Sequence, residues 1–135
     1  MRFRLMLAAI ALALPVSASA LTIDAGLTFD ATGAVHGVRP VIAGQGDVVV
    51  LTISVDPGQV GIGGYNFAFD AATGIEIQTL IAALGGSVSI APDRRVLSFN
   101  NALAADLTAP TVVGTLTFNV ALDAAIGSAV SLRSN

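Results

Sequence analysis

A glycine-rich stretch, GQVGIGG at residues 58–64, raises the question of a phosphate-binding loop. Such a loop places its glycines between a strand and a helix, and the Walker type adds a lysine followed by serine or threonine. Here the glycines lead into YNFAF at residues 65–69, whose aromatic residues alternate as in a strand, and the chain has no lysine. We therefore interpret the glycines as a connection that crosses from one β-sheet to another.

The remaining polar residues give little support for catalytic chemistry. His36 is the only histidine, so any Ser-His-Asp triad would have to include it, and no Gly-x-Ser-x-Gly elbow is present. The nine acidic residues are scattered and lie mostly at turns, which argues against the paired carboxylates of a glycosidase. We predict that the protein is not an enzyme.

Metal binding is the next chemistry to consider. The chain has no cysteine, so it offers no thiolate ligands, and its single histidine cannot form a multi-histidine site. Asp30, Asp70 and Asp123 each precede a glycine by three or four residues, and calcium ligation is the functional alternative for them. Each of these segments supplies one carboxylate, whereas a calcium loop supplies several oxygen ligands. We interpret them as strand-end turns, in which the aspartate accepts backbone N–H groups and the glycine takes positive φ. We predict no metal and no other cofactor.

The first 20 residues have the pattern of a secretory signal peptide. Arg2 and Arg4 precede an apolar run from Leu5 to Val16, and the small residues Ala-Ser-Ala follow at positions 18–20. The run is shorter than the roughly 20 apolar residues that a bilayer requires. We predict cleavage after residue 20, which leaves one domain at residues 21–135, or 135 − 20 = 115 residues. We expect an exported, soluble product in the periplasm, on the cell surface or outside the cell.

The charge of this mature chain limits its partners. Removing Arg2 and Arg4 from the six cationic residues leaves four against nine acids, a net charge of 4 − 9 = −5 with histidine neutral. Nucleic acids and anionic membrane surfaces both select for clustered positive charge. We therefore predict no nucleic acid partner. No segment after residue 20 is apolar enough to span a bilayer, so we also predict no membrane insertion after cleavage.

A period of two dominates the rest of the chain. Short alternating or β-branched runs separated by turn residues occur at 47–56, 65–70, 75–79, 87–90, 96–99, 115–120 and 129–132. This spacing is typical of an all-β, antiparallel β-sandwich. Two short alanine-containing windows, Gln78 to Leu84 and Asn101 to Leu107, are predicted to form single helical turns at most.

The order of these segments resembles the cohesin domain of exported bacterial proteins, which belongs by fold with the family 2 and 3 carbohydrate-binding modules. The resemblance covers residues 34–132. It rests on AGQGD at 43–47 before a strand, FDA at 69–71, PDRR at 92–95 before VLSF, and GTLTFNV at 114–120. It implies a cohesin-like jelly roll.

Two departures from the family pattern stand out. Ala71 replaces the proline of the family's YDP motif. The family also has a further strand at its end, which closes the sheet beside the first strand. Three readings stay open: the chain is a fragment that lacks this last strand, Leu21 to Leu27 takes its place, or an edge stays open. An open edge could add a partner's strand, which includes the option of an edge-strand dimer.

The resemblance implies a binding function in adhesion or scaffolding, with a place in polysaccharide degradation as one setting. Cohesins bind a dockerin, a small calcium-binding helical protein, through a flat sheet face. That face corresponds here to Asn66 and Ala68, with Arg94 or Arg95 nearby. The alternative function is carbohydrate binding. The chain has no Trp and one Tyr, so an aromatic sugar platform is not evident and polar contacts would have to replace it, from Gln59, Asn66, Asn100 or Asn101.

Overall fold

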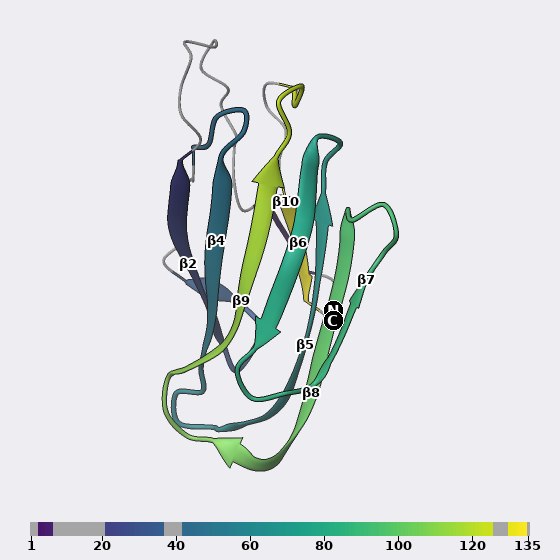
Figure 1. Ribbon diagram of the computed structural model, residues 1–135. Helices are drawn as coiled ribbons and strands as arrows, with labels where there is room; N and C mark the ends of the chain where they lie inside the picture. Colours follow the sequence, from purple (N-terminus) through teal and green to yellow (C-terminus); the bar gives the residue numbers. More distant parts are fainter. Residues whose placement is uncertain (1–2, 7–20, 37–41, 126–129, 135) are drawn as a thin grey trace.

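A computed structural model of the protein describes residues 3–6, 21–36, 42–125 and 130–134. These residues form two layers of β-sheet, and Figure 1 shows the layers face to face. The strands are β1 (Phe3–Met6), β2 (Thr22–Asp30), β3 (Val35–His36), β4 (Val48–Asp56), β5 (Ile62–Ala71), β6 (Ile75–Ala82), β7 (Ser87–Ile90), β8 (Val96–Leu107), β9 (Thr111–Val120) and β10 (Val130–Ser134). The predicted all-β sandwich is confirmed.

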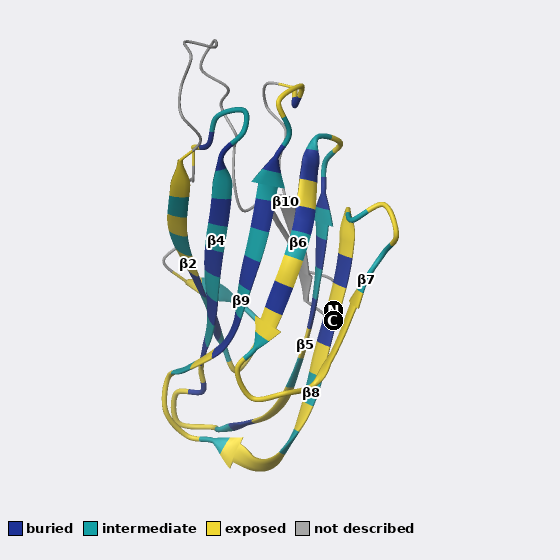
Figure 2. Ribbon diagram, in the orientation of Figure 1, coloured by how far each residue is buried: buried dark blue, intermediate teal, exposed yellow. Residues whose placement is uncertain are grey.

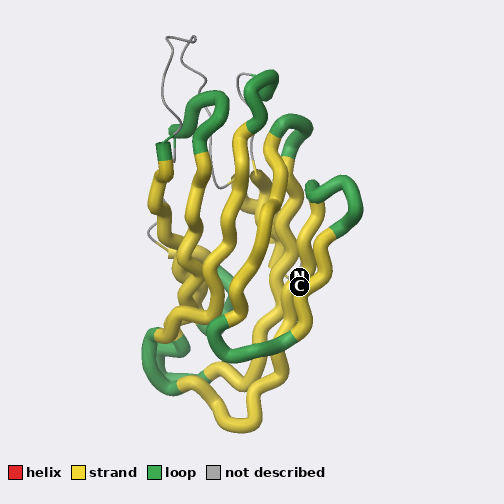
Figure 3. Tube along the Cα trace, viewed as in Figure 1, coloured by secondary structure: helices red, strands yellow, loops and turns green. Residues whose placement is uncertain are grey.

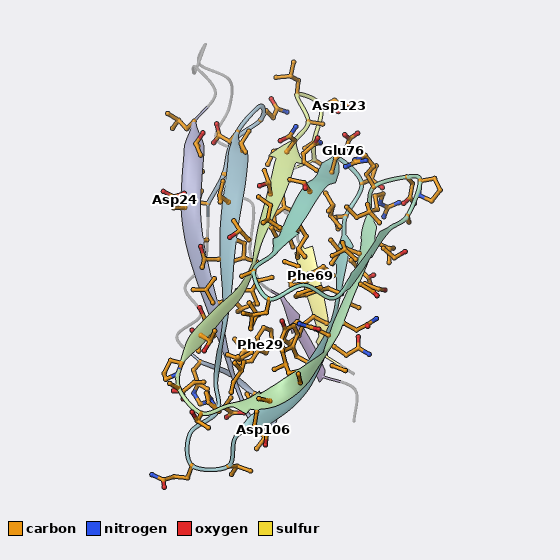
Figure 4. The ribbon with its side chains drawn as sticks, turned by 60° about the horizontal axis from the view of Figure 1, so that its bottom comes forward. Asp24, Phe29, Phe69, Glu76, Asp106 and Asp123 are labelled. Atoms are coloured by element: carbon orange, nitrogen blue, oxygen red, sulfur yellow. The ribbon has the colours of Figure 1, made fainter. Side chains whose placement is uncertain are left out.

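Alternation of side chains accounts for the two-layer arrangement. Along β4 the residues alternate between buried and half-buried, and along β5 Phe67 and Phe69 are buried while their neighbours face outward. Because successive strand residues point to opposite faces, each sheet offers one apolar face to the other. The bands of buried residues in Figure 2 follow this pattern, and Phe29 and Phe69 lie between the sheets in Figure 4.

The strand order departs from a purely antiparallel sandwich at one pair. One sheet has the order β1-β10-β5-β8-β7 and the other has the order β3-β2-β4-β9-β6. Strand β2 runs parallel to β4 over its whole length, from Thr22 beside Val48 to Asp30 beside Asp56, whereas the other recorded pairs are antiparallel. On its other side β2 pairs with β3 only at Thr28 and Phe29.

The two alanine-containing windows form strands instead of the predicted helical turns. Strand β6 extends to Ala82 and β8 extends to Leu107, and Figure 3 shows no helix in the described residues. Their backbone groups pair with β9 and β5, which outweighs the helical preference of a few alanines. Among the described residues, no helix is long and apolar enough to cross a membrane.

The glycine-rich stretch does connect the two sheets, as predicted. It leaves β4 in one sheet and enters β5 in the other. Gly61 has φ of 81°, a conformation that glycine adopts readily. At Gly64 a Cβ atom would lie 2.9 Å from the backbone carbonyl oxygen of Asn101, so this close approach of two strands favours glycine.

Candidate functional site

The outer face of β5, β8 and β7 carries rows of small polar residues. In one row Asn66 of β5 lies beside Asn100 of β8, which lies beside Ser87 of β7. In the next row Ala68 lies beside Ser98, which lies beside Ser89. We call these six residues the polar face. The sequence predicted the outward position of Asn66 and Ala68, and the strand parity confirms it.

The chemistry of the polar face is neutral and rich in hydrogen-bonding groups. Asn66, Asn100 and the three serines are exposed, and Ala68 is half-buried. Amide and hydroxyl groups both donate and accept hydrogen bonds, so they can match the polar groups of many partners. The six residues include no charge and no aromatic ring, and their short side chains leave the backbone of the sheet close to the surface.

A pocket of about 230 Å³ adjoins this face at Asn66. It lies between the turn after β2 and the first half of β5. Strand β10 pairs with β5 only from Phe67 to Ala71, so within the described part of the chain no strand covers that edge of β5 from Ile62 to Asn66. The lining residues are Phe29, Asp30, Ala31, Thr32, Gly33, Val55, Ile62, Gly64, Tyr65, Asn66 and Phe67.

Stacked aromatic rings form part of the pocket wall. The rings of Phe29 and Phe67 are stacked with centroids 4.5 Å apart, and Tyr65 stacks on Phe67 at 5.6 Å. The Tyr65 hydroxyl accepts a hydrogen bond from the side-chain amide of Asn101 at 3.0 Å. That amide also donates to the Leu84 carbonyl at 3.1 Å. Tyr65 lies on the same side of β5 as Phe67 and Phe69, is half-buried and packs against the core from the pocket.

Asp30 closes the turn at the rim of the pocket. One carboxylate oxygen accepts hydrogen bonds from the Thr32 hydroxyl and from the backbone N–H groups of Thr32 and Ala34. The other oxygen lies 2.7 Å from Nε2 of His36. The Thr32 hydroxyl, then His36 and the backbone donors, hold the pKa of Asp30 well below its usual range. Because the carboxylate accepts the backbone N–H groups of Thr32 and Ala34, Asp30 acts as the predicted turn-forming residue.

Arg94 and Arg95 bind strand carbonyls and do not join the polar face, and Arg94 reaches across to the other sheet. The Arg94 side chain donates to the carbonyls of Ile77, at 2.8 Å, and Gln78. The Arg95 side chain donates to the Ala71 carbonyl at 3.1 Å. Arg95 precedes Asn100, the partner of Asn66, by five residues, or about 17 Å along a strand. The structure therefore brings Asn66 together with Asn100 and Ser87, and it separates Asn66 from the two arginines.

The other predicted positions are dispersed. Gln59 lies in the turn between β4 and β5, and Asp123 lies at the opposite end of the sandwich from the pocket, near Glu76 (Figure 4). Asp70 lies in β5 beside Val96. Among the described residues, no group of three or more His, Cys, Asp or Glu side chains is arranged to hold a metal ion.

Comparison of the chain with protein-family models, with curated proteins and with solved structures finds no match in any of the three.

Proposed function

We propose that the protein is an exported, non-catalytic binding module that recognises another macromolecule through the polar face, in the manner of a cohesin. The partner is a protein, of the dockerin-like kind that the resemblance implies. The observation that carries the proposal is the alignment of Asn66, Asn100 and Ser87 in one exposed row, with Ala68, Ser98 and Ser89 in the next.

A protein partner fits this face better than a polysaccharide does. Sugar-binding surfaces commonly stack an exposed aromatic ring on the sugar, and the six residues of the polar face offer none. Their amides and hydroxyls can instead pair with the backbone and side chains of a closely packed partner. The short side chains also lose little rotamer entropy when they become ordered in an interface.

The pocket supports a second candidate function, carbohydrate binding. Its lining includes the half-buried Tyr65 together with Thr32 and Asn66. An apolar wall with a few convergent polar groups is the usual composition of a small-molecule site. A single sugar unit at the end of a chain would suit this pocket better than the middle of a long polysaccharide.

A retention experiment distinguishes the two candidates. The processed protein is immobilised and exposed, separately, to the exported proteins of its source and to a panel of insoluble polysaccharides. Saturable retention of one protein, lost in the variant Ser98→Arg, supports the proposal. Retention of a polysaccharide, lost in Tyr65→Ala and kept in Ser98→Arg, supports the second candidate and contradicts the first.

A further inference from the structure

Among the described residues, Asp47 is the one ionisable residue whose side chain is buried. It is 7% exposed and is the one charged residue among the buried polar side chains. Its backbone is fixed between strands, because its N–H donates to the Gly44 carbonyl at 3.1 Å and its carbonyl accepts the Val120 N–H at 2.9 Å. A buried carboxylate is costly unless it is hydrogen-bonded and paired with positive charge.

The carboxylate has backbone donors on both oxygens. Oδ2 accepts a hydrogen bond from the Gly44 N–H at 2.7 Å, and Oδ1 accepts one from the backbone N–H of Leu21 at 2.9 Å. No ion pair of Asp47 is recorded within the described residues, where the recorded pair is Asp30 with His36. Arg94 and Arg95 direct their guanidinium groups to the carbonyls of other residues. Both donors to Asp47 are neutral amides as long as residue 21 is joined to residue 20.

The nitrogen of Leu21 is also the atom that the predicted signal cleavage would free. Hydrolysis of the peptide bond between residues 20 and 21 adds water across the amide, leaving a carboxylate on residue 20 and an amine on Leu21. At neutral pH that amine takes up a proton and becomes an ammonium group. The carbonyl of Leu21 is already held by the Val48 N–H at 2.8 Å, so the residue is anchored through both of its backbone polar groups.

We propose that Asp47 is a binding site for the α-ammonium group of Leu21, which cleavage after residue 20 creates. The inference rests on the predicted cleavage and is independent of the binding proposal for the polar face. Processing converts one neutral donor at 2.9 Å into a charged group with three donors. Such a charge-assisted hydrogen bond is about twice as strong as a neutral one. Leu21 is thus held more strongly by Asp47 in the processed chain than in its precursor. Cleavage during export would therefore complete this contact.

The first test is the identity of the first residue. The full chain is expressed with its own leader, and the exported product is analysed by mass spectrometry. Leu21 is the expected first residue. Any other first residue overturns the proposal, since the ammonium group would then lie elsewhere.

The second test uses the absence of lysine. All six cationic side chains are arginine, so the α-amine is the only primary amine of the processed chain. An amine-acylating reagent is expected to label the folded wild type about tenfold more slowly than Asp47→Asn, because a one-unit rise in the pKa of an amine lowers its reactive free form tenfold. Asp56→Asn is the matched control: Asp47 directly precedes β4 and Asp56 ends it, and within the described residues the recorded side-chain contact of Asp56 is with the Gly58 N–H at 3.0 Å. Equal rates in all three proteins overturn the proposal.

A third measurement needs no variant and covers the case in which Asp47→Asn does not fold. Acetylation of the single amine in the wild type removes its charge and is expected to lower the folding equilibrium constant by about tenfold. An unchanged urea midpoint after acetylation contradicts the proposal.

Discussion

At the scale of single residues, Asp30 determines the conformation of the turn beside the pocket. Its carboxylate holds Thr32, Ala34 and His36 in place. We expect Asp30→Ala to destabilise the protein more than Asp30→Asn, because the asparagine oxygen can still accept the backbone N–H groups. Urea unfolding of the three proteins measures the order. An Asp30→Ala midpoint equal to that of the wild type contradicts this account of the turn.

The same carboxylate makes stability depend on pH in the acid range. The pKa of Asp30 is lower in the folded protein than in the unfolded chain, where it is near 3.9. Its contribution is therefore fully present above that value and is lost as the pH falls toward the folded pKa. We expect the urea midpoint to fall between pH 5 and pH 2 by more in the wild type than in Asp30→Ala. Parallel curves for the two proteins would show that Asp30 is not responsible.

At the scale of elements, the turn before β8 depends on Arg94. This residue has φ of 58°, and its side chain donates to the carbonyls of Ile77 and Gln78. We expect Arg94→Ala to lower the free energy of unfolding by about 1.5–3 kcal/mol, the usual contribution of hydrogen bonds to a charged group. Partner binding by the folded variant should be unchanged.

The matched comparison is Asn66→Ala, which removes an exposed side chain of the polar face. We expect this variant to keep its stability within about 0.5 kcal/mol and to bind the partner more weakly. Loss of binding without loss of stability in Arg94→Ala would instead restore this arginine as a partner-binding residue.

Strand β8 contributes Phe99 to the core, and this residue is 0% exposed. The ring centroids of Phe99 and Phe67 are 6.2 Å apart. Phe99→Ala leaves a cavity that the neighbouring side chains cannot fill, so we expect the free energy of unfolding to fall by about 3–5 kcal/mol. Val96→Ala in the same strand is the control, because Val96 is 41% exposed and should cost far less. Similar losses for the two variants, measured by thermal unfolding, would contradict the assignment of faces in β8.

Local patterns predicted most strands, because alternation and turn residues are local properties. β4 and the Phe67 side of β5 follow directly from parity. The parallel pairing of β2 with β4 could not be predicted in this way, since it depends on contacts between segments 26 residues apart. The pocket and the role of Arg94 could not be predicted for the same reason. The pocket forms between residues near Phe29 and near Tyr65, and Arg94 binds a carbonyl 17 residues away, so neither has a local sequence signal. The contact of Asp47 with the nitrogen of Leu21 joins residues 26 positions apart and likewise leaves no local sequence signal.

At the scale of the whole molecule, predicted processing alters one edge of the sandwich. β1 lies within residues 1–20 and pairs with β10 from Phe3 beside Ser134 to Met6 beside Ser131. Cleavage after residue 20 would remove β1 and leave the outer backbone groups of β10 without that partner, and such edges favour pairing with another chain. We expect the processed protein to form a dimer whose population rises with concentration in sedimentation experiments. A monomer at every concentration, with β10 amides protected from hydrogen exchange, would contradict this expectation.

One binding comparison tests whether the protein recognises a macromolecule through the polar face. The dissociation constant of the retained partner is measured for the wild type, Ser98→Arg and Thr79→Arg. Ser98 lies on β8, the middle strand of the polar face, and Thr79 lies exposed on β6 in the other sheet. We expect at least about a tenfold weaker complex for Ser98→Arg, because a bulky charge would be buried in the interface, and no change for Thr79→Arg. Equal affinities for Ser98→Arg and the wild type would show that the partner binds elsewhere.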